Sequence, residues 1–162
     1  MEEVIDAIIA QLNEIRELDY DAGGFRDEID IEQVWFDDPR ILPAESYPFI
    51  YVAPGTSRKT SETTQYIDRT LTISIGLLVD PREFYDEDEV AETTASREML
   101  RTVDSIERHF ERKTLRLPDG LAENTVGLEV GETVYSQQLR GDLYGRSALI
   151  TLQVVKRYPR LV

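Results

Sequence analysis

Two periodicities alternate along the chain, and each predicts its own kind of element. Residues 2–18 form the first predicted helix, because their branched apolar side chains recur at helical spacing on one face: Ile5, Ile8, Leu12 and Ile15. Residues 21–24, which include two glycines, mark its end. The pattern therefore predicts a helix with one buried face.

A second helix is predicted over residues 89–112. Its large apolar side chains again share one face: Met99, Val103, Ile106 and Phe110. Basic side chains gather near its C-terminal end, where the helix dipole favours cations: Arg108, Arg112 and Lys113.

Strict alternation predicts two half-buried strands, over residues 66–79 and 147–158. The first strand places its apolar side chains on one face: Ile67, Leu71, Ile73, Ile75, Leu77 and Val79. The second does the same with Ala148, Ile150, Leu152 and Val154. In both strands polar side chains occupy the opposite face, which predicts a sheet with one solvated side.

Weaker signals predict three more strands, over residues 29–36, 49–53 and 125–139. Three prolines make residues 37–48 an irregular connection. Residues 55–65 contain no large apolar side chain, so a long polar hairpin loop is predicted there. A second hairpin loop is predicted over residues 141–145, between the last two strands.

The predicted order of elements is αβββαββ. Strands joined directly to one another, with two interrupting helices, predict an α+β fold. We expect a mostly antiparallel sheet of four to five strands with both helices on one face. A length of 162 residues fits a single domain, 1–162.

Net charge limits the classes of function that fit this chain. With 18 basic and 32 acidic residues, the chain carries −14, and only three of the basic residues are lysines. Such a surface repels phosphate, which argues against nucleic-acid binding. Excess carboxylate with scarce lysine is also typical of proteins from salt-loving organisms, where concentrated salt screens the repulsion. We therefore expect a halophilic source; an ordinary acidic protein is the alternative.

The search for catalytic chemistry finds no recognised motif. The chain has no cysteine and one histidine, His109, which its charged neighbours place at the surface of the second helix. The acidic run 86–89 lacks the spacing of a calcium loop and fits a solvated turn better. We therefore expect no enzyme, no cofactor and no metal site. The longest apolar run, residues 49–53, is far shorter than the roughly 20 residues that span a membrane, so no membrane contact is expected.

Two basic segments stand out on this acidic chain. The first surrounds Arg58 and Lys59 in the predicted loop, and we take the whole segment as a candidate subunit or tube contact: Thr56, Ser57, Arg58, Lys59, Thr60, Ser61 and Glu62. The second is a candidate C-terminal contact: Lys156, Arg157 and Arg160. A basic loop on an acidic protein favours an acidic partner surface; a merely solvated loop is the alternative.

The order of these segments resembles that of tail terminator (tail-completion) proteins of long-tailed viruses, of the lambda-terminator type. The resemblance covers nearly the whole chain, as a sequence of elements without a signature motif. It rests on the first amphipathic helix, the short strand 47–52 after a proline-rich approach, the polar segment leading into strand 66–79, the charged helix 94–112 and the final strand 145–154.

The resemblance implies a structural virion protein in the neck of a virus, here one of haloarchaea. Such proteins form a ring, hexameric in this type, that caps the tail tube, stops its polymerisation and offers a head-joining surface. The implied partners are further copies of the chain, the tail tube protein and a head-side connector or adaptor. DNA only passes through the acidic lumen, and assembly takes place in the host cytoplasm. The family has no catalytic residues to transfer.

Two other functions remain open at this point. One is another neck or tail component: a head-completion adaptor, a stopper or a tube subunit. The other is a halophilic ligand- or metal-binding domain, which predicts a monomer or dimer whose melting responds to Ca²⁺ or a small molecule.

Overall fold

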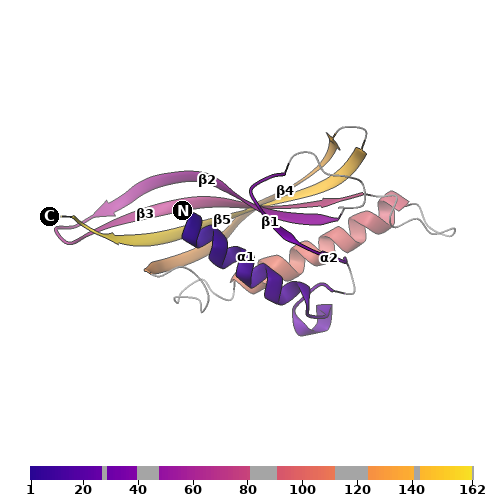
Figure 1. The fold of residues 1–162 in the computed structure, drawn as a ribbon, viewed down its shortest axis with the longest axis horizontal. Coiled ribbons are helices and arrows are strands. Elements are labelled where there is room, and N and C mark those ends of the chain that lie inside the picture. Colours follow the sequence, from indigo (N-terminus) through magenta and orange to yellow (C-terminus); the bar gives the residue numbers. More distant parts are fainter. Residues whose placement is uncertain (27–28, 40–47, 81–90, 112–123, 141–142, 162) are drawn as a thin grey trace.

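The computed structural model describes residues 1–26, 29–39, 48–80, 91–111, 124–140 and 143–161. It is an α+β fold with two helices and a five-stranded sheet (Figure 1). The elements in chain order are α1 (Glu2–Arg16), the 3₁₀ turn η1 (Tyr20–Ala22), β1 (Val34–Phe36), β2 (Phe49–Glu62), β3 (Tyr66–Val79), α2 (Ala91–Glu111), β4 (Thr125–Arg140) and β5 (Leu143–Pro159).

The sheet is mixed, with strand order β1-β2-β3-β5-β4. Three of the four pairings are antiparallel, but β1 runs parallel to β2, which a mostly antiparallel prediction did not include. A parallel neighbour requires a crossover connection, and residues 37–48 between the two strands are long enough to provide it. The chain turns directly after β1 at Asp37, which has a φ of 64° and whose carboxylate accepts the backbone N–H of Asp38 at 2.8 Å.

One hydrophobic core joins both helices to one face of the sheet. All four predicted core residues of each helix are buried in it, and so are those of β5. β3 contributes five of the six side chains that the sequence predicts: Leu71, Ile73, Ile75, Leu77 and Val79. The sixth, Ile67, is only half-buried. The period of each element therefore identified the buried face correctly.

The turn that follows α1 depends on two glycines. Gly23 has a φ of +92°, in the left-handed region, and closes the η1 turn. At Gly24 a Cβ would lie 2.2 Å from the carbonyl oxygen of Leu18, so no side chain fits. This close approach lets the chain turn back toward the sheet immediately after α1.

The opposite face of the sheet carries a small aromatic cluster of its own. Phe49, Tyr51 and Leu78 are buried there, with Trp35 packed against them. The Tyr51 ring lies directly over Gly76, where a Cβ would approach the ring carbon Cζ to 2.1 Å. Below we call this side of the sheet the outer face, since the helices cover the other.

Several predicted boundaries need correction. The strand predicted over 29–36 is reduced to β1, although Ile29 and Ile31 before it are buried. The loop predicted over 141–145 is too long, because β5 begins at Leu143. The acidic run 86–89 lies outside the described residues.

Candidate functional site

The candidate site is an arm at one end of the sheet, most of which extends beyond the helices. We define the arm as residues 54–70 and 155–161, from β2, β3, the turn between them and the end of β5. Every residue of β2 from Pro54 to Glu62 is exposed. In Figure 1 these strands run together to one end of the molecule, where the C-terminus also lies.

The prediction of a polar loop over residues 55–65 is wrong. β2 continues as a strand to Glu62, and β3 begins at Tyr66, so only three residues form the turn. Beyond the helices both faces of the strand meet solvent, and the alternation that reveals a half-buried strand is lost. The candidate segment, Thr56 to Glu62, therefore lies on a strand, with register shifts between Pro54 and Ser57 and between Lys59 and Ser61.

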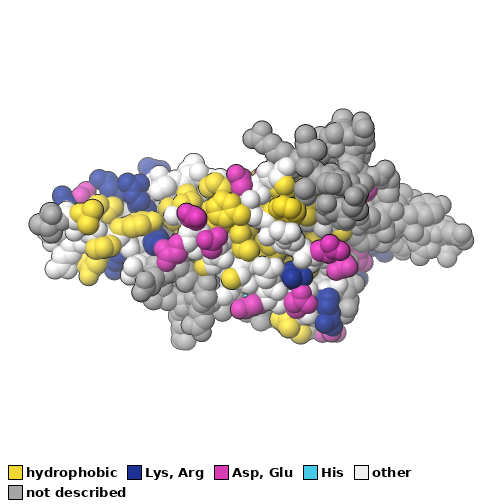
Figure 2. Space-filling model, viewed as in Figure 1, with side chains coloured by type: hydrophobic (Ala, Val, Ile, Leu, Met, Phe, Trp, Pro, Cys, Tyr) yellow, Lys and Arg dark blue, Asp and Glu magenta, His cyan; other side chains and the backbone are white. Residues whose placement is uncertain are grey.

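Charge is divided unevenly between the arm and the rest of the chain. The arm has two acidic residues, Glu62 and Asp68, and six basic ones: Arg58, Lys59, Arg69, Lys156, Arg157 and Arg160. Its formal charge is thus 6 − 2 = +4, and the remainder carries −14 − 4 = −18. Figure 2 shows Lys and Arg side chains gathered toward the arm end, whereas Asp and Glu lie across the middle of the visible face.

A row of three cations crosses the arm on the side of the sheet that carries the helices. Lys59 lies opposite Arg69, which in turn lies opposite Lys156. Like charges in such a row repel each other, and two of the three have a carboxylate partner. Lys156 is buried and pairs with Glu3 of α1, while Lys59 donates to Oε2 of Glu62 at 2.9 Å.

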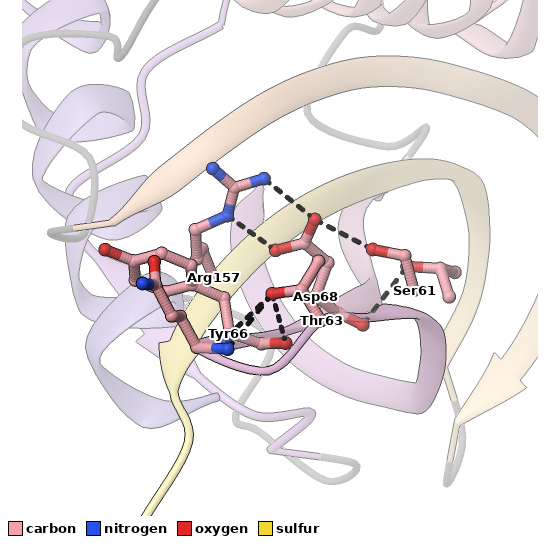
Figure 3. Close-up of polar contacts among 7 residues, drawn as sticks. Ser61, Thr63, Tyr66, Asp68 and Arg157 are labelled. Atoms are coloured by element: carbon pink, nitrogen blue, oxygen red, sulfur yellow. Dashed lines mark hydrogen bonds and ion pairs between the residues drawn. The ribbon is translucent and has the colours of Figure 1, made fainter.

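A bidentate ion pair stiffens the outer face of the arm (Figure 3). Arg157 donates from Nε and Nη2 to the two carboxylate oxygens of Asp68, at 2.8 and 3.0 Å. The Ser61 hydroxyl donates to the same carboxylate, and the Arg157 guanidinium lies 5.4 Å from the centre of the Tyr66 ring. The hydrogen bonds from Arg157 hold the pKa of Asp68 below its usual value.

The tip of the arm is held by local hydrogen bonds. The Thr63 hydroxyl accepts the backbone N–H of Tyr66 at 3.0 Å, and the Thr63 N–H donates to the Tyr66 carbonyl at 2.8 Å. Arg160 donates its backbone N–H to Gln65 and lies 3.4 Å from the Glu62 carboxylate. The hydrogen bond from Lys59, with the nearby Arg160 charge, lowers the pKa of Glu62.

Two guanidinium groups of the arm lack a carboxylate partner among the described residues. Arg58 has no ion pair there, and Arg69 donates only to the Ser57 hydroxyl at 3.4 Å. A shallow groove lies beside Arg58, lined by threonine hydroxyls as well as cations: Thr56, Arg58, Lys59, Thr60, Thr70, Thr72 and Gln153. The arm thus presents positive charge that the described part of the chain does not neutralise.

The structure brings the two predicted basic segments together. Strand pairing places Arg58 and Lys59 within the same arm as Lys156, Arg157 and Arg160. The three C-terminal candidates each form an ion pair within the chain: Lys156 with Glu3, Arg157 with Asp68 and Arg160 with Glu62.

Sequence reasoning missed Arg69 and the role of Asp68. Arg69 is a cation at a position that the alternation of β3 assigns to the apolar face, and this interruption was the available signal. The pairing of Asp68 with Arg157 depends on cross-strand register, which a single sequence does not display.

His109 has a structural position between the helices. The surface position predicted for it is wrong, since the side chain is half-buried. Its Nε2 donates to Oε1 of Gln11 at 2.7 Å, and Gln11 is only 4% exposed. This hydrogen bond satisfies a buried amide oxygen and ties α2 to α1.

Nothing in the described part of the chain provides a metal centre, since no three His, Cys, Asp or Glu side chains gather there. Among the same residues, no helix is both long and apolar enough to cross a membrane.

No protein-family model matches the chain, and no curated protein has a significantly similar sequence. The features of the molecule that indicate a function are therefore the arm, the charge distribution and the order of elements.

Proposed function

We propose that the chain is a structural virion protein of the tail-terminator type, which forms a ring on the tail tube. The ring stops tube growth and provides the surface to which the head attaches. The observation that carries the proposal is the charge division: an arm of +4 extends from a molecule whose remainder carries −18.

This charge division supports self-assembly in a ring. Cyclic rings use heterologous contacts, in which one patch of a subunit fits a different patch of the next copy. A basic arm and an acidic remainder supply two such complementary patches on one chain. The ion pair of Arg157 with Asp68 keeps the arm ordered before contact, which lowers the entropic cost of docking.

The same charge suits a channel through which DNA passes. Six copies would carry 6 × −14 = −84 formal charges. If the arms are neutralised between subunits, the remaining surface is strongly acidic and repels phosphate. DNA therefore moves through the lumen without being held. The fold adds a sheet with one face that neither described helix covers, available for contacts between subunits or with the tube.

The experiment that tests this function is a tube-length assay with the tail tube protein of the same virus. Addition of the chain should stop polymerisation and leave short, capped tubes in electron micrographs. The variant Arg58→Glu/Lys59→Glu should lose this effect, because reversing both charges turns attraction into repulsion. Arg26→Glu/Arg101→Glu changes the net charge equally outside the arm and should still cap.

The assay also separates the proposal from its nearest alternatives. A tube subunit would join growing tubes and lengthen them, and a head-side adaptor would leave tube length unchanged. Either result with the unmodified chain contradicts the terminator function.

A further inference from the structure

The sheet has two long open edges among the described residues. β1 pairs with β2 only at Ile50, Tyr51 and Val52, so residues 53–62 of β2 have no strand beyond them. On the other side of the sheet, β4 pairs with β5 alone. At about 3.3 Å per residue, the open part of β2 extends roughly 33 Å. Open edges present unpaired backbone N–H and C=O groups and are templates for pairing with another chain.

The two edges carry opposite charges. Residues 53–62 of β2 contain Arg58 and Lys59 against one acidic residue, Glu62. Residues 125–137 of β4 contain only acidic charges, Glu129 and Glu132, both exposed. β4 also exposes Val126 by 43% and Val134 by 48%, apolar side chains that a neighbouring strand would cover.

We propose that the β2 edge of one copy pairs with the β4 edge of the next, so that the sheet continues from subunit to subunit. This inference rests on the self-assembly part of the proposed function and not on its role in a viral tail. The partner is a second copy because one chain carries both complementary edges. The contact is heterologous, as a closed ring requires.

Strand direction and register fit this pairing. β2 and β5 run in one direction, and β4 runs in the opposite direction. If the next copy is related by a rotation about an axis along the strands, its β2 keeps its direction. The β4 strand of the first copy then lies antiparallel to the β2 strand of the next. Within the chain, Arg58 lies level with Thr70, Val155 and Gly127 across the sheet. If the two sheets join at the same level, with no shift along the strands, Arg58 of one copy lies opposite Gly127 of the next.

In this register Arg58 and Glu129 become diagonal neighbours. Glu129 lies two residues from Gly127, opposite Gln153, and both Arg58 and Glu129 belong to the outer face. Diagonal neighbours in antiparallel sheets lie about 7–8 Å apart, within reach of an arginine. The register shifts in β2 and β4 limit regular pairing to the segments between them.

The first test uses the absence of native cysteine. Thr60→Cys on β2 and Val126→Cys on β4 are made in separate chains, and the mixture is treated with a short bismaleimide. We expect a cross-linked pair from the mixture and little from either variant alone, because the contact is heterologous. A mixture of Thr60→Cys with Leu100→Cys, which is exposed on α2, is the matched control.

The second test restores a charge pair. Arg58→Glu/Lys59→Glu should weaken self-association about tenfold or more. Adding Glu129→Lys/Glu132→Lys to the same chain should restore it, since each edge then meets the opposite charge again. Adding Glu14→Lys/Glu17→Lys at the C-terminal end of α1 makes the same change in net charge and should not restore it.

Two outcomes overturn the inference. One is an assembled protein whose Thr60/Val126 mixture cross-links no better than the Thr60/Leu100 control. The other is a chain that stays monomeric at every concentration and salt. That second result leaves the capping function open, because tube length measures capping separately.

Discussion

At the scale of single residues, the pair of Asp68 and Arg157 adds a side-chain link to the backbone pairing of the arm. It joins β3 to β5 on the outer face, on the side of the sheet away from the helices. Asp68 accepts two hydrogen bonds from Arg157 and one from Ser61, so its carboxylate has little freedom.

The stabilisation from this pair should depend on pH. The pKa of Asp68 is lowered in the folded state, so its contribution is fully present above the unfolded pKa of about 3.9 and is lost as pH falls through the lower folded pKa. Asp68→Asn should therefore lower the free energy of unfolding slightly at pH 7, and by progressively less as pH falls below about 3.9. Urea titrations at several pH values check this, with exposed Asp21→Asn as the control; a difference independent of pH contradicts it.

The second prediction at this scale concerns Gly76, which lies under the ring of Tyr51. Gly76→Ala puts a Cβ into the space of the Tyr51 ring, which must move out of its buried position. Overpacking of this kind costs about 1–3 kcal/mol. Gly127→Ala on β4 meets no atom closer than 3.8 Å and should cost much less. Equal thermal midpoints for the two variants would show that Tyr51 does not depend on Gly76.

At the scale of elements, the packing of α2 on the sheet can be tested within one helix. Ile106 is fully buried, whereas Leu100 is half exposed on the same helix. Ile106→Ala should cost about 2–5 kcal/mol through lost burial and a cavity. Leu100→Ala should cost far less, since water already reaches that side chain. Denaturant unfolding measures both, and similar losses would contradict the assigned face of α2.

Much of the architecture could be predicted from the sequence because burial imposes a period. The faces of α1 and α2 and the alternation of β3 and β5 emerged in this way. Residues 54–62 of β2 could not be predicted as a strand, because solvent on both faces removes the alternation of apolar and polar side chains. The parallel pairing of β1 also has no local signal, since three residues are too few to show one.

The candidate site was only partly predictable for a related reason. The two basic segments can be recognised in the sequence, because they stand out on an acidic chain. Their gathering in one arm depends on the register of β2, β3 and β5, which tertiary structure sets. The engagement of Lys156 by Glu3 joins residues at opposite ends of the chain and has no signature in either segment.

At the scale of the whole molecule, the charge of −18 outside the arm predicts a dependence on salt. Concentrated KCl shortens the Debye length to about 3 Å at 1 M, which screens repulsion among the carboxylates. The midpoint of thermal unfolding should therefore rise from low to multimolar KCl. Equal midpoints in both would contradict the halophilic interpretation.

The mass of the particles in solution decides whether copies of the chain assemble with one another. Light scattering over a range of KCl concentrations measures that mass, because salt screens both the repulsion between acidic copies and the attraction between the two edges. We expect one closed species near six times the chain mass of 18.6 kDa. A monomer at every concentration, or a polymer of unlimited length, would contradict a ring formed by complementary edges of one chain.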